Sequence, residues 1–252
     1  FQLYRDNNSG IVWTYLEKNH NHESYYFSEK YIPHKEKKGF FGFLYSFVQK
    51  IMFRYKLQNL KNHINKDKIV LDYGSGDGRF AEYLNQLQIK TITYDPLVNK
   101  LDKSEPFGYQ ITENQVDTLM MWHVLEHIPD LESSIKVICN SVKNKGSLII
   151  AVPNIDSFDS KLYKECWAGL DVPRHLYHFN HESLIKFIEK HGFIYNYKKP
   201  LIFDSFYVSI LSEKNRSNPF GILIGLTMGL ISNFFALFSS NYSSSFYVFT
   251  KD

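Results

Sequence analysis

The chain has 252 residues, which is long enough for one large domain with appendages and a sizeable hydrophobic core. Its net charge of +3 is small and no dense run of lysine or arginine occurs, so we expect no nucleic acid among its partners. Its two cysteines, Cys139 and Cys166, suit a reducing compartment, and a cytoplasmic protein is the default expectation.

Residues 1–62 are expected to form an aromatic arm that leads into a helix. The arm alternates polar and aromatic residues and reads as an extended or short-helical segment. Apolar residues then recur with helical spacing, which predicts a helix over 39–62 whose lysine and arginine side chains face solvent. This part either packs on the core or covers a ligand site to exclude water, and both readings stay open. Four residues of the arm are candidate substrate contacts: Tyr25, Tyr26, Tyr31 and His34.

A glycine-rich turn follows the first predicted strand of the central part, residues 69–72. Glycine recurs at 74, 76 and 78, and a helix is expected over 77–88. Glycines allow positive φ and close approach of a ligand to the backbone, and the start of a helix offers free N–H groups. The unit predicts a site for a nucleotide-like ligand. The expected contacts are Asp72, Tyr73, Gly74, Ser75, Gly76 and Gly78.

The second strand, expected over 90–95, ends in Asp95 and is followed by Pro96. In a doubly wound sheet the carboxyl end of this strand lies beside that of the first. An acid at this point can accept hydrogen bonds from both ribose hydroxyls of a nucleoside. Both residues are therefore candidate ligand contacts, and a short third strand is expected within 107–111.

A fourth strand is expected over 116–121, with Trp122 and His123 at its carboxyl end. Ligands bind at that edge in open α/β sheets, so both residues are candidate ligand contacts, and His123 is also a candidate catalytic residue. His123 and His127 have the spacing i, i+4, but no third ligand accompanies them at a recognisable spacing. We therefore expect no metal. A helix over 131–142 and a fifth strand over 147–152 follow.

The loop over 167–180 carries an arginine and two histidines between aromatic residues, and specificity residues tend to lie in such loops. The pKa of histidine lies near working pH, so His175 or His178 is a candidate general base. Arg174 is a candidate anchor for an anionic group of the substrate. The alternative is that Asp171, Arg174 and His175 only hold the loop in place. A helix over 182–191 follows.

Strands are expected over 193–199 and 245–250, as an antiparallel pair at one edge of the sheet. Their connection of about 45 residues far exceeds a hairpin loop. Asp204 is expected to cap a helix in it, and the segment 220–238 lacks charged residues over the length of a membrane span. If residues 245–250 join the sheet, the segment 220–238 cannot cross a membrane once, because the last strand would then lie on the far side from its partner. Glycines at every fourth position favour a buried helix pair or a homodimer, whereas the apolar surface of 219–240 favours a membrane surface or a lipid-linked substrate.

Four motifs resemble those of the class I S-adenosylmethionine (SAM) methyltransferases, in particular bacterial proteins similar to ubiquinone-type O-methyltransferases. The glycine motif is specific for SAM binding, whereas the other three indicate a family and no substrate. The motifs are Tyr-Tyr-x-Ser-x-x-Tyr-Ile-x-His at 25–34, Leu-Asp-Tyr-Gly-Ser-Gly-Asp-Gly at 71–78, His-Val-Leu-Glu-His-Ile-Pro-Asp at 123–130 and Pro-Arg-His-Leu-Tyr-His-Phe at 173–179.

The resemblance implies an α/β fold, a Rossmann-like three-layer sandwich with a seven-stranded, mostly parallel sheet and an antiparallel last strand. Three parts are expected. Residues 1–62 would form a lid or cap, residues 63–200 with 245–252 the SAM-binding core, and residues 201–244 a hydrophobic helical insertion. The glycine turn would approach the methionine portion of SAM, with Asp72 orienting the turn or the amino group.

The implied activity is transfer of a methyl group from SAM to a hydroxyl or amine of a small molecule, such as a sugar, a lipid-linked compound or a secondary metabolite. By resemblance Asp95 would hold the ribose, and Trp122 and His123 would border the adenosyl and methyl region. Two alternatives stay open: a SAM-binding protein without turnover, and an NAD(P)-dependent oxidoreductase. The second is disfavoured because Arg79 stands where a dinucleotide fingerprint has its third glycine.

Overall fold

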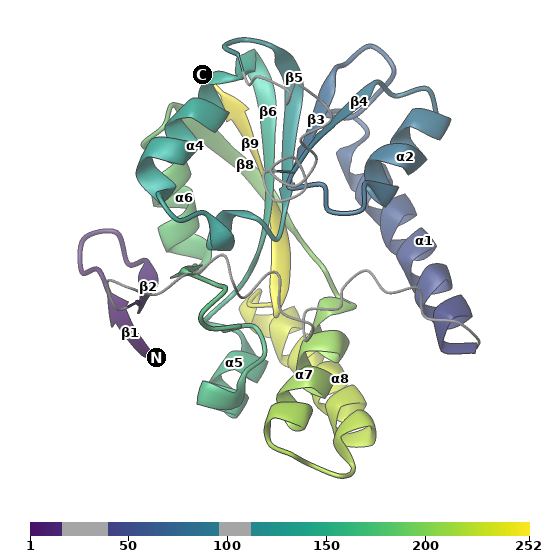
Figure 1. Ribbon diagram of the computed structural model, residues 1–252, viewed down its shortest axis with the longest axis vertical. Helices are drawn as coiled ribbons and strands as arrows, with labels where there is room; N and C mark the ends of the chain where they lie inside the picture. Colours follow the sequence, from purple (N-terminus) through teal and green to yellow (C-terminus); the bar gives the residue numbers. More distant parts are fainter. Residues whose placement is uncertain (17–39, 96–111) are drawn as a thin grey trace, which may run out of the picture.

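The computed structural model describes residues 1–16, 40–95 and 112–252 (Figure 1). Several expected features lie outside the described residues. They are the candidate substrate contacts Tyr25, Tyr26, Tyr31 and His34, the candidate cofactor contact Pro96, and the third strand expected within 107–111.

A six-stranded sheet of order β4-β3-β5-β6-β9-β8 forms the centre of the molecule. β3 pairs in parallel with β4 and β5, and β5 with β6, whereas β9 is antiparallel to both β6 and β8. The predicted α/β fold with an antiparallel last strand is confirmed, with six strands in the described part where seven were predicted. The strands are β3 (Val70–Tyr73), β4 (Thr91–Tyr94), β5 (Val116–Trp122), β6 (Val142–Pro153), β8 (Phe193–Pro200) and β9 (Ser244–Lys251).

Helices cover both faces of this sheet and complete three layers (Figure 1). Successive strand residues point to opposite faces. On one face Val70 and Met120 pack with Phe80 of α2, and on the other Leu71 and Leu119 pack with the apolar sides of α4 and α6. The predicted helices thus exist, and α2, α4 and α6 bury apolar residues that their spacing indicated, whereas Phe47 and Ile51 of α1 are exposed. They are α1 (Phe40–Leu60), α2 (Arg79–Gln86), α4 (Leu131–Asn140) and α6 (His181–Glu189).

The N-terminal segment forms part of a second, three-stranded antiparallel sheet. β1 (Gln2–Arg5) pairs with β2 (Val12–Tyr15), which pairs with β7 (Tyr177–His178). In β2 the side chains alternate between buried and exposed, as in a strand with one face on the protein. The first residues of the chain therefore lie directly against the histidine-rich loop.

A helical hairpin, α7 (Asp204–Asn215) and α8 (Gly221–Ser239), connects β8 to β9 and extends away from the sheet (Figure 1). Phe203 stands at the N-cap of α7, so the prediction that Asp204 caps this helix is wrong. In the described part of the chain α8 is the one helix long and apolar enough to cross a membrane. The chain returns from α8 into β9, which pairs with β6 and β8, so α8 does not make a single crossing.

A buried carboxylate joins α8 to the rest of the molecule. Asp159 belongs to α5 (Phe158–Tyr163), which is followed by the short helix η3 (Lys164–Cys166). Its two oxygens accept hydrogen bonds from Trp167 Nε1 (2.8 Å), Ser243 Oγ (2.7 Å) and Ser232 Oγ of α8 (2.8 Å). Three donors from separate segments thus converge on one fully buried side chain.

Replacing Asp159 by Ala is expected to lower the free energy of unfolding by about 3 kcal/mol, because it leaves three buried donors without their acceptor. Chemical denaturation measures this loss. Asp67→Ala, at an exposed position, is the matched control and is expected to change stability by less than about 0.5 kcal/mol. Equal stability of the two variants would contradict the anchoring role of Asp159.

Candidate active site

The glycine turn lies where β3 ends and α2 begins, packed against the segments that follow β4 and β5. Gly74, Gly76 and Gly78 all have positive φ, at 74°, 57° and 71°. A Cβ atom at position 74 would lie 2.3 Å from a methyl group of Val124, so glycine is also required there by close approach. The N–H of Gly76 donates to Asp95 Oδ2 at 2.9 Å, which brings the predicted acid of the second strand to the turn.

A lysine that sequence reasoning placed in solvent lies beside the turn. The ammonium of Lys56, on α1, lies 3.6 Å from the centroid of the Trp122 ring and 5.1 Å from that of Phe80. The expectation that the basic residues of this helix all face solvent is therefore wrong. Burial lowers the pKa of Lys56 to about 8, although Asp204 and Asp72 draw it upwards.

Asp72 is buried at the end of β3. Burial raises the pKa of its carboxyl group to about 7, and nearby Asp95 adds to this effect while Lys56 opposes it. The turn therefore has acidic groups on two sides, Asp72 and Asp95, and three glycines that bring its backbone close to a ligand. The amino group and ribose hydroxyls of SAM are donors that these carboxylates can accept from, so the residues present fit SAM.

The affinity for SAM is expected to rise between pH 5.5 and 7.5, by at most about tenfold per pH unit, because ionised Asp72 attracts the ammonium group. The same raised pKa lowers the free energy of unfolding as the pH rises from about 4 towards 7, since the folded state holds the proton more tightly. Isothermal titration calorimetry across this range measures the affinity. Asp72→Asn is expected to flatten the profile, and an unchanged profile in that variant would assign the effect to another group.

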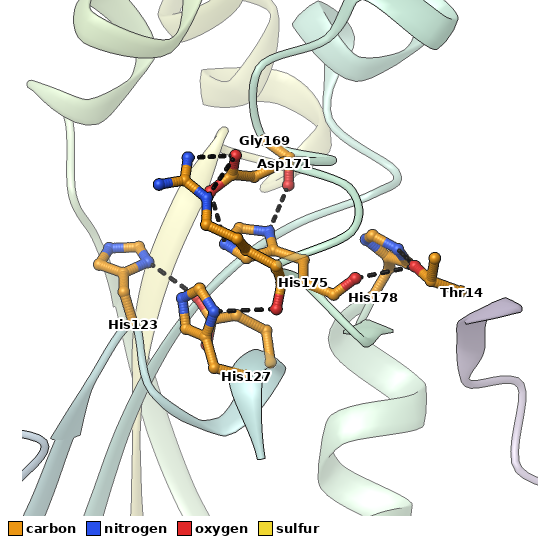
Figure 2. A network of polar contacts seen from close by, with 9 residues as sticks. Thr14, His123, His127, Gly169, Asp171, His175 and His178 are labelled. Atoms are coloured by element: carbon orange, nitrogen blue, oxygen red, sulfur yellow. Dashed lines mark hydrogen bonds and ion pairs between the residues drawn. The ribbon is translucent and has the colours of Figure 1, made fainter. Parts of the chain in front are cut away.

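His123 follows β5 directly and has a φ of 55°. Its Nε2 donates to Asp204 Oδ2 at 3.1 Å, and its Nδ1 lies 3.3 Å from Glu126 Oε1. Figure 2 shows His123 next to His127 in this network of polar contacts. Burial lowers the pKa of His123, but the hydrogen bonds to Asp204 and Glu126 outweigh burial and raise it to about 10. The side chain is 37% exposed, whereas that of Glu126 is 1% exposed. The ring thus has a buried acid on one nitrogen and an accessible acid on the other.

The two histidines of the 167–180 loop are buried and held by the protein (Figure 2). His175 Nδ1 donates to the carbonyl of Gly169 at 2.9 Å. The Thr14 hydroxyl donates to the carbonyl of His175 at 2.8 Å and therefore accepts from His178 Nε2 at 3.0 Å. Burial lowers the pKa of His175 to about 3 and that of His178 to about 4, so both rings are neutral. This geometry favours the alternative in which these residues hold the loop.

Arg174 is also held by a residue of its own loop. Its guanidinium binds Asp171 through Nε, at 3.2 Å from Oδ1, and through a second, shorter contact from the Nη2 atom. Both side chains are about one-quarter exposed. The arginine is thus committed to a neighbour within its own loop, and its role as an anchor for a substrate anion stays a prediction.

Glu126, His127 and His175 are the group of described residues most similar to a metal site, with potential ligand atoms within 4.8 Å of one another. A tetrahedral ion with bonds of about 2.1 Å needs its ligands roughly 3.4 Å apart. His127 Nδ1 donates to the carbonyl of Arg174, and Glu126 pairs with His123. In their observed positions these groups form a network of protein contacts that fixes the loop on the short helix η2 (Leu125–His127).

Sequence reasoning missed four residues around the site: Lys56, Glu126, Asp204 and Thr14. Glu126 had a usable signal, because it stands three residues after His123 within the motif at 123–130. Lys56 interrupts an otherwise apolar helix face, which is a weaker signal. Asp204 and Thr14 reach the site only through the fold, from positions 81 residues after His123 and 164 residues before His178.

The family described as "Methyltransferase domain" matches residues 45–195 of the chain. No curated protein matches this chain. Among solved structures, a possible histamine N-methyltransferase from Thermotoga maritima is 16% identical, with a TM-score of 0.52, and the match covers 83% of this chain and 97% of that one. A putative sarcosine dimethylglycine methyltransferase from Galdieria sulphuraria is 14% identical, with a TM-score of 0.51, and the match covers 82% and 86%.

A third solved structure matches nearly the whole chain. It is a 1,6-didemethyltoxoflavin-N1-methyltransferase from Burkholderia thailandensis, with bound 1,6-didemethyltoxoflavin and S-adenosylhomocysteine. The identity is 14%, the TM-score is 0.51, and the match covers 98% of this chain and 97% of that one. At such identities the three structures support the fold described above, which is the Rossmann-like sandwich.

Proposed function

Because the chain belongs to the methyltransferase-domain family and its cofactor is SAM, we propose that it methylates a hydroxyl or amine of a small molecule at the carboxyl edge of β5. The observation that carries this proposal is the position of His123. It follows β5 directly, next to the segment that contacts the glycine turn, and its partly exposed ring has a buried acid behind it.

SAM supplies a methyl group on a sulfonium, an electrophile that needs only a correctly placed nucleophile. The glycine turn, Asp72 and Asp95 would hold it at the edge of β3 and β4. Lys56 and Trp122 would border the site from the side of α1. The enzyme then contributes mainly orientation of the nucleophile, an effect that reaches about 7–11 kcal/mol in well-aligned systems.

The acceptor must lose a proton when its oxygen or nitrogen is methylated. In our proposal the acceptor replaces Asp204 at Nε2 of His123. Buried Glu126 keeps the proton on Nδ1, so the lone pair of the neutral ring lies on Nε2 and faces the acceptor. The proton that Nε2 carries in the acceptor-free enzyme passes to Asp204 or to solvent. His123 then accepts the proton of the nucleophile.

A screen with radiolabelled SAM tests the reaction, with hydroxylated sugars, nucleotide sugars, quinone-like phenols and simple amines as acceptors. Transfer of label to any of these classes, with S-adenosylhomocysteine as co-product, supports the proposal. Thermal stabilisation by SAM without transfer to any acceptor would favour a binding protein without turnover. Stabilisation by NAD but by neither adenosyl compound would favour the oxidoreductase.

A further inference from the structure

The α7–α8 hairpin has its small and polar side chains inside and its large apolar side chains outside. The buried positions of α7 are Ser205, Ser209, Ser212 and Glu213, and those of α8 are Gly221, Gly225, Gly229, Ser232 and Ala236. On α8 and its N-cap, nine large apolar residues are 42–78% exposed: Phe220, Ile222, Leu223, Leu226, Leu230, Phe234, Phe235, Leu237 and Phe238. In a helix at the surface of a globular protein the arrangement is reversed, with the large apolar side chains facing the core and the polar side chains facing water.

The small residues are required by the packing of the two helices. A Cβ atom at Gly225 would lie 2.5 Å from the Cα atom of Ile210, and one at Gly229 would lie 2.8 Å from that of Phe206. Two buried serines of α7 donate to backbone carbonyls inside the hairpin: Ser205 Oγ to that of Gly229 on α8 at 3.3 Å, and Ser212 Oγ to that of Val208 at 2.8 Å. Close backbone contact between small residues, with polar groups as supplementary bonds, is typical of helix pairs in lipid.

We propose that the α7–α8 hairpin is a docking surface on which this protein binds the face of an anionic phospholipid bilayer. Basic residues border the apolar surface, as anionic lipid requires. α5 packs on α8 through stacked Phe158 and Phe235, and Arg216 Nη2 donates to the carbonyl of Leu162. The exposed charges of these elements are mostly positive: Lys161, Lys164 and Lys214 stand against Glu165, and Arg216 is paired with buried Glu213 at 3.9 Å.

The width of the apolar surface favours a bilayer over a second copy of the chain. At about 100° per residue the exposed positions of α8 spread over roughly 220° of the helix circumference. A stripe that packs against a core or a partner helix needs only about 100°. The hairpin is also held firmly to the core by Asp159, so it would carry the whole molecule to the membrane.

The bilayer would lie at the same end of the molecule as the acceptor site. Asp204, the first residue of α7, is the partner of His123 Nε2. If the proposed function holds, acceptors attached to a lipid are the class that this arrangement serves. Membrane binding itself does not depend on that function and is tested without turnover.

The test is co-sedimentation of the whole chain with vesicles of phosphatidylcholine and phosphatidylglycerol, and with vesicles of phosphatidylcholine alone. A triple variant, L223E/L230E/F238E, changes three residues of α8 that are 68%, 62% and 78% exposed. The matched control, L87E/V137E/I194E, introduces the same charge at exposed apolar positions outside the hairpin, which are 39%, 57% and 53% exposed. Thermal unfolding verifies that both variants are folded.

The wild type and the control are expected to bind the anionic vesicles, and the α8 variant to bind at least roughly tenfold more weakly. Weaker binding to neutral vesicles would support the role of the basic residues. Equal binding by the α8 variant and the control would overturn the proposal. A second outcome would also overturn it: the wild type does not bind vesicles but forms a stable dimer in sedimentation velocity, and the α8 variant does not form that dimer. The apolar surface would then be covered by a second copy of the chain.

Discussion

Gly74→Ala is expected to lower the affinity for SAM by roughly 100-fold or more, because it moves the turn that should approach the cofactor. Two costs coincide at this position. Alanine is strained at a φ of 74°, and its Cβ atom would lie 2.3 Å from Val124. Together they are expected to reduce the free energy of unfolding by about 2–4 kcal/mol. Calorimetric titration with SAM and chemical denaturation measure the two effects.

Gly192→Ala separates strain from steric overlap. Gly192 has a φ of 82°, but an added Cβ atom there would have no neighbour within 4 Å. This variant is expected to lose only about 1 kcal/mol of stability and to keep its affinity for SAM. An unchanged affinity in Gly74→Ala would show that the turn is not the cofactor cradle.

Much of the central sheet could be predicted from the sequence because its signals are local. The strand that ends at Tyr73, the positive-φ glycines and the helix from Arg79 are each encoded within a few neighbouring residues. β5 and residues 147–152 of β6 are likewise visible as apolar runs, whereas the polar beginning of β6 over 142–146 was not predicted, and the helix predicted over 131–142 ends at Asn140. Parallel topology then brings the carboxyl ends of these strands together, so the position of the cofactor site follows from the fold class.

Contacts between distant segments could not be predicted in this way. β2 pairs with β7 across more than 160 residues, and no periodicity in either segment specifies that partner. Lysine is a residue type that usually lies at the surface, yet the neighbouring Trp122 ring and two carboxylates make the inward position of Lys56 favourable. The environment of a histidine also depends on such contacts. His178 has a motif position as suggestive as that of His123, but Thr14 and burial keep it neutral and enclosed.

His123→Ala is expected to lower kcat by about 10²–10⁴-fold while changing the affinity for SAM less than about threefold, because it removes the proposed proton acceptor and leaves the glycine turn intact. The matched control is His178→Gln, whose amide N–H can still donate to Thr14 and which should keep its turnover. With a hydroxyl acceptor, kcat/KM of the wild type should rise with pH between 7 and 10. The flanking carboxylates raise the pKa of His123 to about 10, and only the neutral ring can accept a proton. Turnover that survives in His123→Ala and is lost in His178→Gln would move the base to the loop that β2 covers, and would make the His123–Glu126 pair a structural contact.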